Sequence, residues 1–299
     1  MGRVDYGLLP TEQIHPRSRN LDRLSSLQIV RLMNAEDRHV LKAIARAAPR
    51  IASAVRRVAG ALQRRGRLIF VGAGTSGRLG VIEAAECPPT FNSPPAMVQA
   101  IMAGGRPAVF RSKEGVEDSE AQAVAACRRM GVGKGDVMVG IAASGVTPFV
   151  RSALRYARGR KARTVLLTCH PKPPKAAEII IALRTGPEIL AGSTRLKAGT
   201  ACKMVLNMLT TASMVRLGKV YGNRMVDLQP RSRKLVERGV RLIREIGRVG
   251  EREARRLLKE ARGHVKTAIV MARKGCSYGR AARRLASVRG FLWEALSQP

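Results

Sequence analysis

Short apolar runs alternate with segments of helical periodicity through the middle of the sequence, from residue 67 to residue 218. Five of these runs are typical of buried strands, because they are short, apolar and bounded by turn residues. Parallel strands need crossover connections, which are usually helices. The alternation therefore predicts an α/β fold in which helices sandwich a parallel sheet. The expected strands lie at 67–71, 96–104, 136–144, 163–169 and 178–186, and expected helices lie at 119–131, 147–159 and 197–218.

The region before the first expected strand is helical. Residues 21–63 carry apolar side chains at spacings of three and four, which is the period of a helix that buries one face. Ser25 or Ser26 can cap the first helix, and Pro49 is expected to begin a second one. Residues 1–20 are polar, contain two prolines and predict an extended arm.

The region after the sheet is helical and basic, and Phe291 and Trp293 are expected to anchor its small core. The sequence thus predicts three parts. They are N-terminal arm and helices over 1–56, the sheet domain over 57–222, and a C-terminal helical appendage over 223–299.

The composition excludes several classes of protein. No apolar stretch reaches the length of about 18 residues that a membrane span needs, and the N-terminus lacks the apolar segment of a secretion signal. The five cysteines are scattered and form no C-x-x-C pair, which suits a reducing compartment and gives no disulfide framework or zinc site. We expect a cytoplasmic protein with no membrane anchor and no metal.

The net charge of +34 is the least ordinary property of the chain. Such a charge attracts polyanions, so non-specific polyanion binding at low salt is expected. Only ten aromatic residues are present, which argues against a platform that stacks single-stranded bases. Because the Lys and Arg residues are spread along the chain, an arginine-rich solvated surface without a partner is the alternative.

A glycine-rich segment, "GAGTSG" at residues 72–77, follows the first expected strand and fits the dinucleotide pattern G-x-G-x-x-G. A dinucleotide site also needs an acidic residue at the end of the next strand, where it holds the ribose. The next strand here ends "IMAGGR" and offers no carboxylate. The pattern is therefore weak evidence for a dinucleotide.

The hydroxyl side chains of two loops indicate an anion simpler than a dinucleotide. Thr75 and Ser76 lie in this loop, and Ser144 and Thr147 lie in the loop after the 136–144 strand. Each loop precedes a helix, whose free N–H groups and dipole favour an anion. Two such loops at the carboxyl ends of parallel strands can converge on one phosphate. The alternative is that these residues only cap their helices.

Carboxylates gather in two segments near these loops. Glu83 and Glu86 are three residues apart and share a helix face, and that helix is expected to end at Cys87, before two prolines. Glu114 and Glu117 lie in a loop with few basic neighbours. Two carboxylates over one substrate can divide acid and base roles. Alternatively, the carboxylates of Glu114 and Glu117 serve only to stabilise a helix N-terminus.

The motifs "GAGTSGRLG", "ECPPTF" and "STRLKAGTA" occur in this order, and with them the chain resembles the N-acetylmuramic acid 6-phosphate etherases of the sugar isomerase (SIS) fold group, nearly end to end. The resemblance implies a lyase that cleaves the D-lactyl ether, giving N-acetylglucosamine 6-phosphate and D-lactate in the recycling of cell-wall amino sugars. The sugar opens to its aldehyde, a carboxylate removes the C2 proton, lactate leaves C3 and water then adds. The resemblance implies no metal or organic cofactor.

The same resemblance assigns residues. It makes Glu86 the acid and Glu117 the base, in an order that could be exchanged. It also implies homodimers with sites at the subunit boundary. One departure is Val146, where the family usually has Arg. A non-catalytic sugar-phosphate regulator on the same fold is the alternative, although a binder needs neither glutamate. The implied phosphate-binding residues are Thr75, Ser76, Gly77, Ser144, Gly145 and Thr147.

Overall fold

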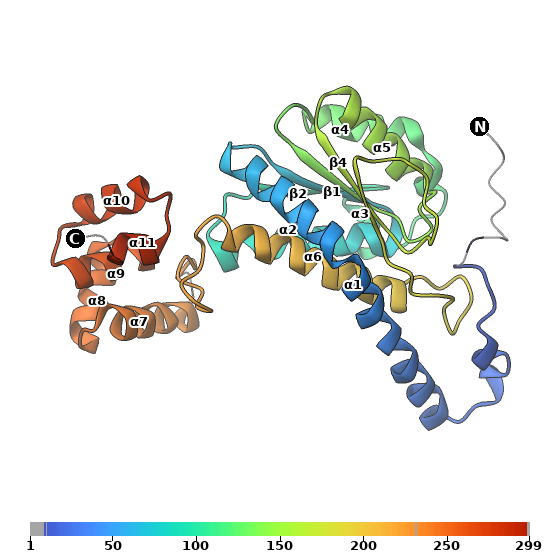
Figure 1. Cartoon of the computed structure of the whole chain (residues 1–299), viewed down its shortest axis with the longest axis horizontal. Helices are drawn as coiled ribbons and strands as arrows, with labels where there is room; N and C mark the ends of the chain where they lie inside the picture. The colour runs from blue at the N-terminus through green and yellow to red at the C-terminus, as the bar shows by residue number, and fades with distance from the viewer. Residues whose placement is uncertain (1–8, 10, 231, 298–299) are drawn as a thin grey trace. The chain divides into compact units, whose positions relative to one another are not determined.

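The computed structural model describes residue 9, residues 11–230 and residues 232–297 (Figure 1). The described chain separates into two compact units. The first contains the residues up to 85 together with 96–210, and the second contains 86–95 and the residues from 211 onwards. Each unit has its own hydrophobic core, so each is treated separately below.

The first unit is built on a five-stranded sheet with the order β2-β1-β3-β4-β5, and every neighbouring pair is parallel. Four of the five strands fall within the runs expected from the sequence, β1 extends one residue past its expected end at Val71, and the predicted α/β fold is confirmed. The strands are Leu68–Gly72 (β1), Val98–Met102 (β2), Val137–Ile141 (β3), Arg163–Thr168 (β4) and Ile179–Ala182 (β5).

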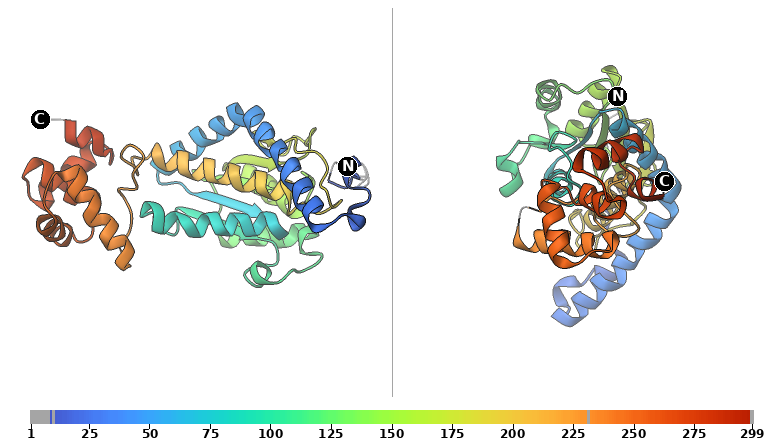
Figure 2. Two further views of the ribbon diagram at one scale, coloured as in Figure 1. Left: turned by 90° about the horizontal axis from the view of Figure 1, so that it is seen from below. Right: turned by 90° about the vertical axis from the view of Figure 1, so that its left-hand side faces the viewer.

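Helices cover both faces of this sheet (Figure 1). Helices α4 (Glu120–Arg129) and α5 (Pro148–Gly159) cover one face, where buried side chains of β1 and β3 pack with Phe149 and Leu154 of α5. Helices α1 (Ser26–Gln63), α6 (Lys197–Val215) and α2 (Gly74–Phe91) lie side by side on the other face (Figure 2). The strands are therefore apolar on both faces, which explains why they appear in the sequence as continuous apolar runs.

Helix α1 is one continuous helix of 38 residues, so the expected helix start at Pro49 was wrong. Its buried residues continue with helical spacing across Pro49, through Ala47 and Ile51, and burying this row outweighs the roughly 3 kcal/mol that an internal proline costs. Ser25 caps the helix in a capping box with Gln28, as one of the two expected caps. In the described chain, no helix is both long enough and apolar enough to cross a bilayer.

The expected arm at 1–20 lies partly outside the described residues. Its described part forms a short 3₁₀ turn at Pro16–Ser18 and buries His15. A second such turn follows at Leu21–Arg23, and the short helix α3 occupies Pro107–Phe110.

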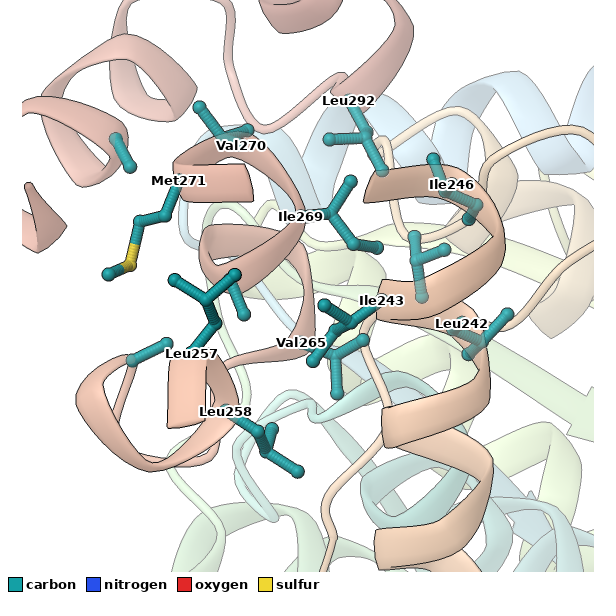
Figure 3. Packing of buried hydrophobic residues seen from close by; sticks show 14 of the residues in the cluster. Leu242, Ile243, Ile246, Leu257, Leu258, Val265, Ile269, Val270, Met271 and Leu292 are labelled. Carbon is teal, nitrogen blue, oxygen red and sulfur yellow. The ribbon is translucent and has the colours of Figure 1, made fainter. Parts of the chain in front are cut away.

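The second unit is a small helical bundle, as expected, whose core is shown in Figure 3. The expected anchor Trp293 is wrong, because its side chain is 57% exposed. Neighbouring residues on a helix point about 100° apart, so the inward direction of fully buried Leu292 turns Trp293 outward. The helices are α7 (Arg233–Gly247), α8 (Glu251–Glu260), α9 (Val265–Lys274), α10 (Tyr278–Ser287) and α11 (Leu292–Ser297).

Candidate active site

The strand order creates a switch point between β1 and β3. The chain leaves β1 toward β2 on one side, and it leaves β3 toward β4 on the other. The loops at the carboxyl ends of these two strands therefore diverge and leave a crevice, which is where ligands bind in open α/β sheets. A cavity of about 230 Å³ lies here, lined by residues of both loops.

In the first loop, which connects β1 to α2, the start of the helix lies very close to the end of the strand. A Cβ on Gly77 would lie 2.7 Å from the carbonyl oxygen of Gly72, and a Cβ on Gly72 would lie 2.7 Å from the amide nitrogen of Gly77. The two glycines thus let the helix begin directly against the strand end. Thr75 and Ser76 line the cavity, whereas Gly77 lies behind them. The amides of Gly74, Thr75 and Ser76 begin α2 without an intrahelical partner and are available to an anion, whereas the amide of Gly77 donates to the carbonyl of Ala73 at 3.1 Å.

The second loop connects β3 to α5 and brings Ser144 and Thr147 to the same cavity. Gly145 does not line the cavity, but its φ of +75° and the 2.9 Å from its Cβ position to Thr168 Oγ1 require a glycine. Thr147 occupies the N-cap position of α5, yet its side chain makes no capping hydrogen bond. Helix capping therefore does not account for the Thr147 hydroxyl. Ser144 Oγ accepts a hydrogen bond from the amide of Val146 at 3.4 Å.

A third wall of the cavity comes from the chain after β2. Arg78, in the first turns of α2, donates from Nε to the carbonyl of Val109 and from Nη2 to that of Ala108, both at 2.9 Å. These bonds hold the segment from which Lys113, also a lining residue, extends. Arg78 and Lys113 give the cavity positive charge beside its hydroxyl groups.

Glu117 lines the cavity from a 3₁₀ turn at Val116–Asp118, which follows Gly115 with a φ of +73°. Its carboxylate has no hydrogen-bond or ion-pair partner among the described residues, so it is free to accept a proton. Glu120 behaves differently, because it lies in the first turn of α4 and pairs with Arg155 at 3.1 Å. The helix-terminus interpretation thus fits Glu120, whereas Glu114 and Glu117 face the cavity.

Glu86 is exposed and is not among the residues that line the cavity. Helix α2 continues through both prolines to Phe91, so the expected end at Cys87 was wrong. The prolines fall in the last turns, where they remove only two donors and where the fixed φ of proline still suits a helix. The structure therefore brings together Thr75, Ser76, Ser144, Thr147 and Glu117, and it does not bring Glu86 to them.

Glu83, on the same helix, is buried and fully engaged. One carboxylate oxygen lies 2.7 Å from Lys203 Nζ, and the other accepts from Thr210 Oγ1 at 2.5 Å. Both partners belong to α6, so Glu83 fastens α2 to α6. These contacts give Glu83 a structural role.

Thr194 completes the cavity, and a buried network fixes the chain behind it. Glu188 accepts hydrogen bonds from the amides of Lys197 at 3.1 Å and Ala198 at 2.8 Å, which caps α6. Burial raises the pKa of Glu188, and these amide bonds oppose the rise. Lys197 Nζ in turn lies 2.8 Å from Glu36.

The Glu36 carboxylate also contacts His15 Nε2 at 3.0 Å. Although burial acts to raise the pKa of Glu36, the hydrogen bond and charge of Lys197, together with His15, hold it below its usual value.

The polar lining residues that were not anticipated are Arg78, Ser112, Lys113 and Thr194. Arg78 had a local signal, since it follows Gly77 directly in the glycine motif. Thr194 lies in the motif "STRLKAGTA", which carried the family resemblance but gave no residue of it a role. Lys113 lies in irregular chain and had no such signal. In the described part of the chain, no three His, Cys, Asp or Glu side chains cluster as a metal site would require.

Two family models match overlapping parts of the chain. The model described as glucokinase regulatory protein N-terminal SIS domain matches residues 50–158, and the model described as SIS domain matches residues 120–212. Together they cover the sheet and both loops of the cavity.

Curated proteins match along nearly the whole chain. The N-acetylmuramic acid 6-phosphate etherase of Geobacillus thermodenitrificans (strain NG80-2) is 50% identical over 290 residues, which are 96% of this chain and 98% of that protein. The etherase of the same name from Edwardsiella ictaluri (strain 93-146) is 49% identical and covers 99% of both chains.

Solved structures are more distant. A phosphoheptose isomerase from Francisella tularensis is 16% identical, with a TM-score of 0.46 over 64% of this chain and 98% of that chain. The Vibrio vulnificus NanR protein complexed with ManNAc-6P is 16% identical, with a TM-score of 0.42 over 62% of this chain and 63% of that chain. TM-scores this low assign no function to this chain.

Proposed function

The chain belongs to the N-acetylmuramic acid 6-phosphate etherase family, and we propose that the cavity at the switch point of its sheet is the active site. The protein is a carbon–oxygen lyase of amino-sugar metabolism. It cleaves the D-lactyl ether of N-acetylmuramic acid 6-phosphate and gives N-acetylglucosamine 6-phosphate and D-lactate. The observation that carries the proposal is the single cavity that holds two hydroxyl-bearing loops and an unpaired carboxylate.

The phosphate binds between the two loops. Thr75, Ser76, Ser144 and Thr147 donate hydroxyl hydrogen bonds, and the first-turn amides of α2 add N–H donors. Gly77 and Gly145 act indirectly, because they allow the backbone of each loop to adopt its shape. Arg78 adds positive charge at the same end of the cavity.

Glu117 is the base of the reaction. Opening of the sugar ring gives an aldehyde at C1, which acidifies the proton on C2. The Glu117 carboxylate takes this proton, the C–H electron pair forms the C2–C3 double bond, and the C3–O bond breaks. Lactate leaves with a proton from the acid, Glu86. Water then adds, with its hydroxyl on C3 and a proton on C2, so no metal or organic cofactor is required.

Glu86 reaches the cavity from a second copy of the chain. In this arrangement the enzyme is a homodimer, and each site combines Glu117 of one subunit with Glu86 of the other. The exposure of Glu86 on α2 supports this assignment, because a buried side chain could not serve a neighbouring subunit.

The remaining assignments follow the same family relationship. Residues 57–222 form the sugar-phosphate domain, flanked by the N-terminal part over 1–56 and the C-terminal helices over 223–299. The protein acts in the cytoplasm, where phosphorylated amino sugars are available.

D-Lactate release from N-acetylmuramic acid 6-phosphate tests the proposal. Glu117→Ala should lower kcat by about 10²- to 10⁴-fold, the usual contribution of a general base, and should still bind N-acetylglucosamine 6-phosphate. Glu120→Gln is the matched control, because Glu120 is a nearby carboxylate paired with Arg155, and it should retain activity. A folded wild type that binds the sugar phosphate without turnover would instead indicate a regulator.

A further inference from the structure

A second, larger concavity lies in the first unit and is strongly basic. This groove has a volume of about 890 Å³. Helix α1 and its C-cap contribute Arg56, Arg57 and Arg64, the turn before β3 contributes Lys134, and the end of α5 and the turn after it contribute Arg158 and Lys161. All six side chains are exposed. None of them contributes to the cavity proposed as the active site.

The topology places this groove away from the sugar-phosphate cavity. Arg64 and Lys134 each precede a strand and Arg163 begins one, whereas Ser76 and Ser144 each follow one. Because all strands are parallel, the groove lies at the amino edge of the sheet and the cavity lies at its carboxyl edge. The two sites can therefore be altered independently.

The charge of the groove is not neutralised within the described residues. Glu178 is its single acidic lining residue, and it pairs with Arg163 at 3.3 Å. The six cations named above have no acidic partner in the described part of the chain. The C-terminal ends of α1 and α5 contribute only about half a negative charge each, which is far less than six positive charges.

The floor of the groove allows close approach. Small residues of α1 line it: Ser53 lies one turn before Arg56, and Gly60 and Ala61 lie between Arg57 and Arg64. From Arg56 to Arg64 the helix rises by about 12 Å, which matches three to four phosphates of one duplex strand at about 3.4 Å each.

The lining chemistry selects among polyanions. Most of the cations are arginines, whose planar forks suit phosphate oxygens. No aromatic side chain lines the groove, so bases cannot stack there. No large apolar side chain lines it either, so it offers nothing to insert into a lipid bilayer. A regular phosphodiester backbone is the ligand that uses only what this groove provides.

We propose that this basic groove binds the phosphodiester backbone of double-stranded nucleic acid, without reading its sequence. This second binding function gives the excess positive charge a defined location. It stands independently of the etherase activity, since no groove residue touches the sugar-phosphate cavity.

The test is fluorescence anisotropy with a labelled DNA duplex of about 20 base pairs and the full-length protein. The groove variant carries Arg57→Glu, Arg64→Glu and Arg158→Glu. A matched control variant carries Arg252→Glu, Arg280→Glu and Arg283→Glu, three exposed cations of the second unit with no ion pair among the described residues. Each variant lowers the net charge by six units, two for each substitution.

With six phosphate contacts, the slope of log affinity against log salt should be about −5 for the wild type and the control variant, and about −3 for the groove variant. Between about 50 and 200 mM salt, affinity should then fall on the order of 10³-fold for the first two and about 60-fold for the groove variant. At the lower salt the groove variant should bind at least about tenfold more weakly than the control. Unchanged thermal unfolding establishes that both variants are folded.

Equal losses in the two variants would overturn the proposal, because net charge rather than the groove would then set the affinity. Unchanged binding by the groove variant would overturn it as well. Vesicles that contain phosphatidylserine provide a further arm. If the groove substitutions abolish vesicle binding and leave duplex binding unchanged, the assignment to nucleic acid is wrong.

Discussion

Gly77→Ala tests most sharply how the backbone of the first loop shapes the active site. The added Cβ would lie 2.7 Å from the carbonyl oxygen of Gly72, 3.0 Å from its carbonyl carbon and 3.1 Å from Met102 Cγ. Two of these neighbours are backbone atoms of β1, which cannot turn aside as a side chain can. The start of α2 must therefore move away from the sheet.

The expected magnitude combines two opposing terms. Alanine improves helix propensity by up to about 1 kcal/mol over glycine, whereas forcing an extra methyl into a packed contact costs about 1–3 kcal/mol. The packing cost exceeds the gain in helix propensity because the added methyl group meets backbone atoms. We therefore expect the free energy of unfolding to fall by up to about 2 kcal/mol. Activity should fall further, by about 100-fold in kcat/KM, since a shift of about 1 Å in a substrate-binding group has that effect.

Thermal unfolding and steady-state D-lactate release measure the two effects. Gly159→Ala is the matched control, because it lies in helix α5 with no atom within 4 Å of its Cβ position. It should be as active as the wild type and equally or slightly more stable. If Gly77→Ala proved as stable and as active as this control, the close approach of α2 to β1 would not shape the site as argued here.

Three further predictions follow from the contacts around the cavity. Thr147→Val should raise KM about 10- to 100-fold, because a hydrogen bond to a charged phosphate contributes about 1.5–3 kcal/mol. The midpoint of thermal unfolding should not change, since this hydroxyl does not cap α5. A lowered midpoint of unfolding with an unchanged KM would contradict the assignment. Lys197→Met should cost up to about 3–5 kcal/mol in chemical denaturation, because it removes the buried cation that lies closest to Glu36 and leaves this carboxylate with His15 and with the largely exposed Arg17, at 3.6 Å. The added change Glu36→Gln should recover part of that loss, and no recovery would count against the pair. The folded pKa of Glu36 lies below its ordinary value of 4.5, so its ionised form stabilises the fold above that pH, and this stability is lost as the pH falls through the folded pKa. Glu36→Gln should therefore flatten the acid side of the profile of unfolding free energy against pH. An unchanged acid slope would refute this.

The sheet could be predicted from the sequence because parallel strands buried on both faces, such as Leu68–Gly72, appear as continuous apolar runs. The helix ends could not be predicted equally well. Proline rules placed a boundary at Pro49 and another near Pro88, but burial continues across the first, and the second falls in the last turns of α2. A proline therefore does not end a helix where burial of the rest of that helix stabilises it by more than the proline costs.

The two loops that line the cavity could be anticipated because their positions follow from topology, since every loop after a parallel strand lies at the same edge of the sheet. Lys113 could not, because it reaches the cavity on an irregular segment that distant contacts hold. Arg78 binds the carbonyls of Ala108 and Val109, thirty or more residues away, and no periodic pattern records such a bond.

The central claim is elimination at the C2–C3 bond followed by hydration, with Glu117 as the base. The most direct test is turnover in water enriched in deuterium and oxygen-18, with both products analysed by fragment mass spectrometry. The account predicts deuterium at C2 and oxygen-18 in the C3 hydroxyl of N-acetylglucosamine 6-phosphate, with the original ether oxygen in lactate, and no labelled product from Glu117→Gln. Oxygen-18 in the lactate hydroxyl, or no deuterium at C2, would contradict it.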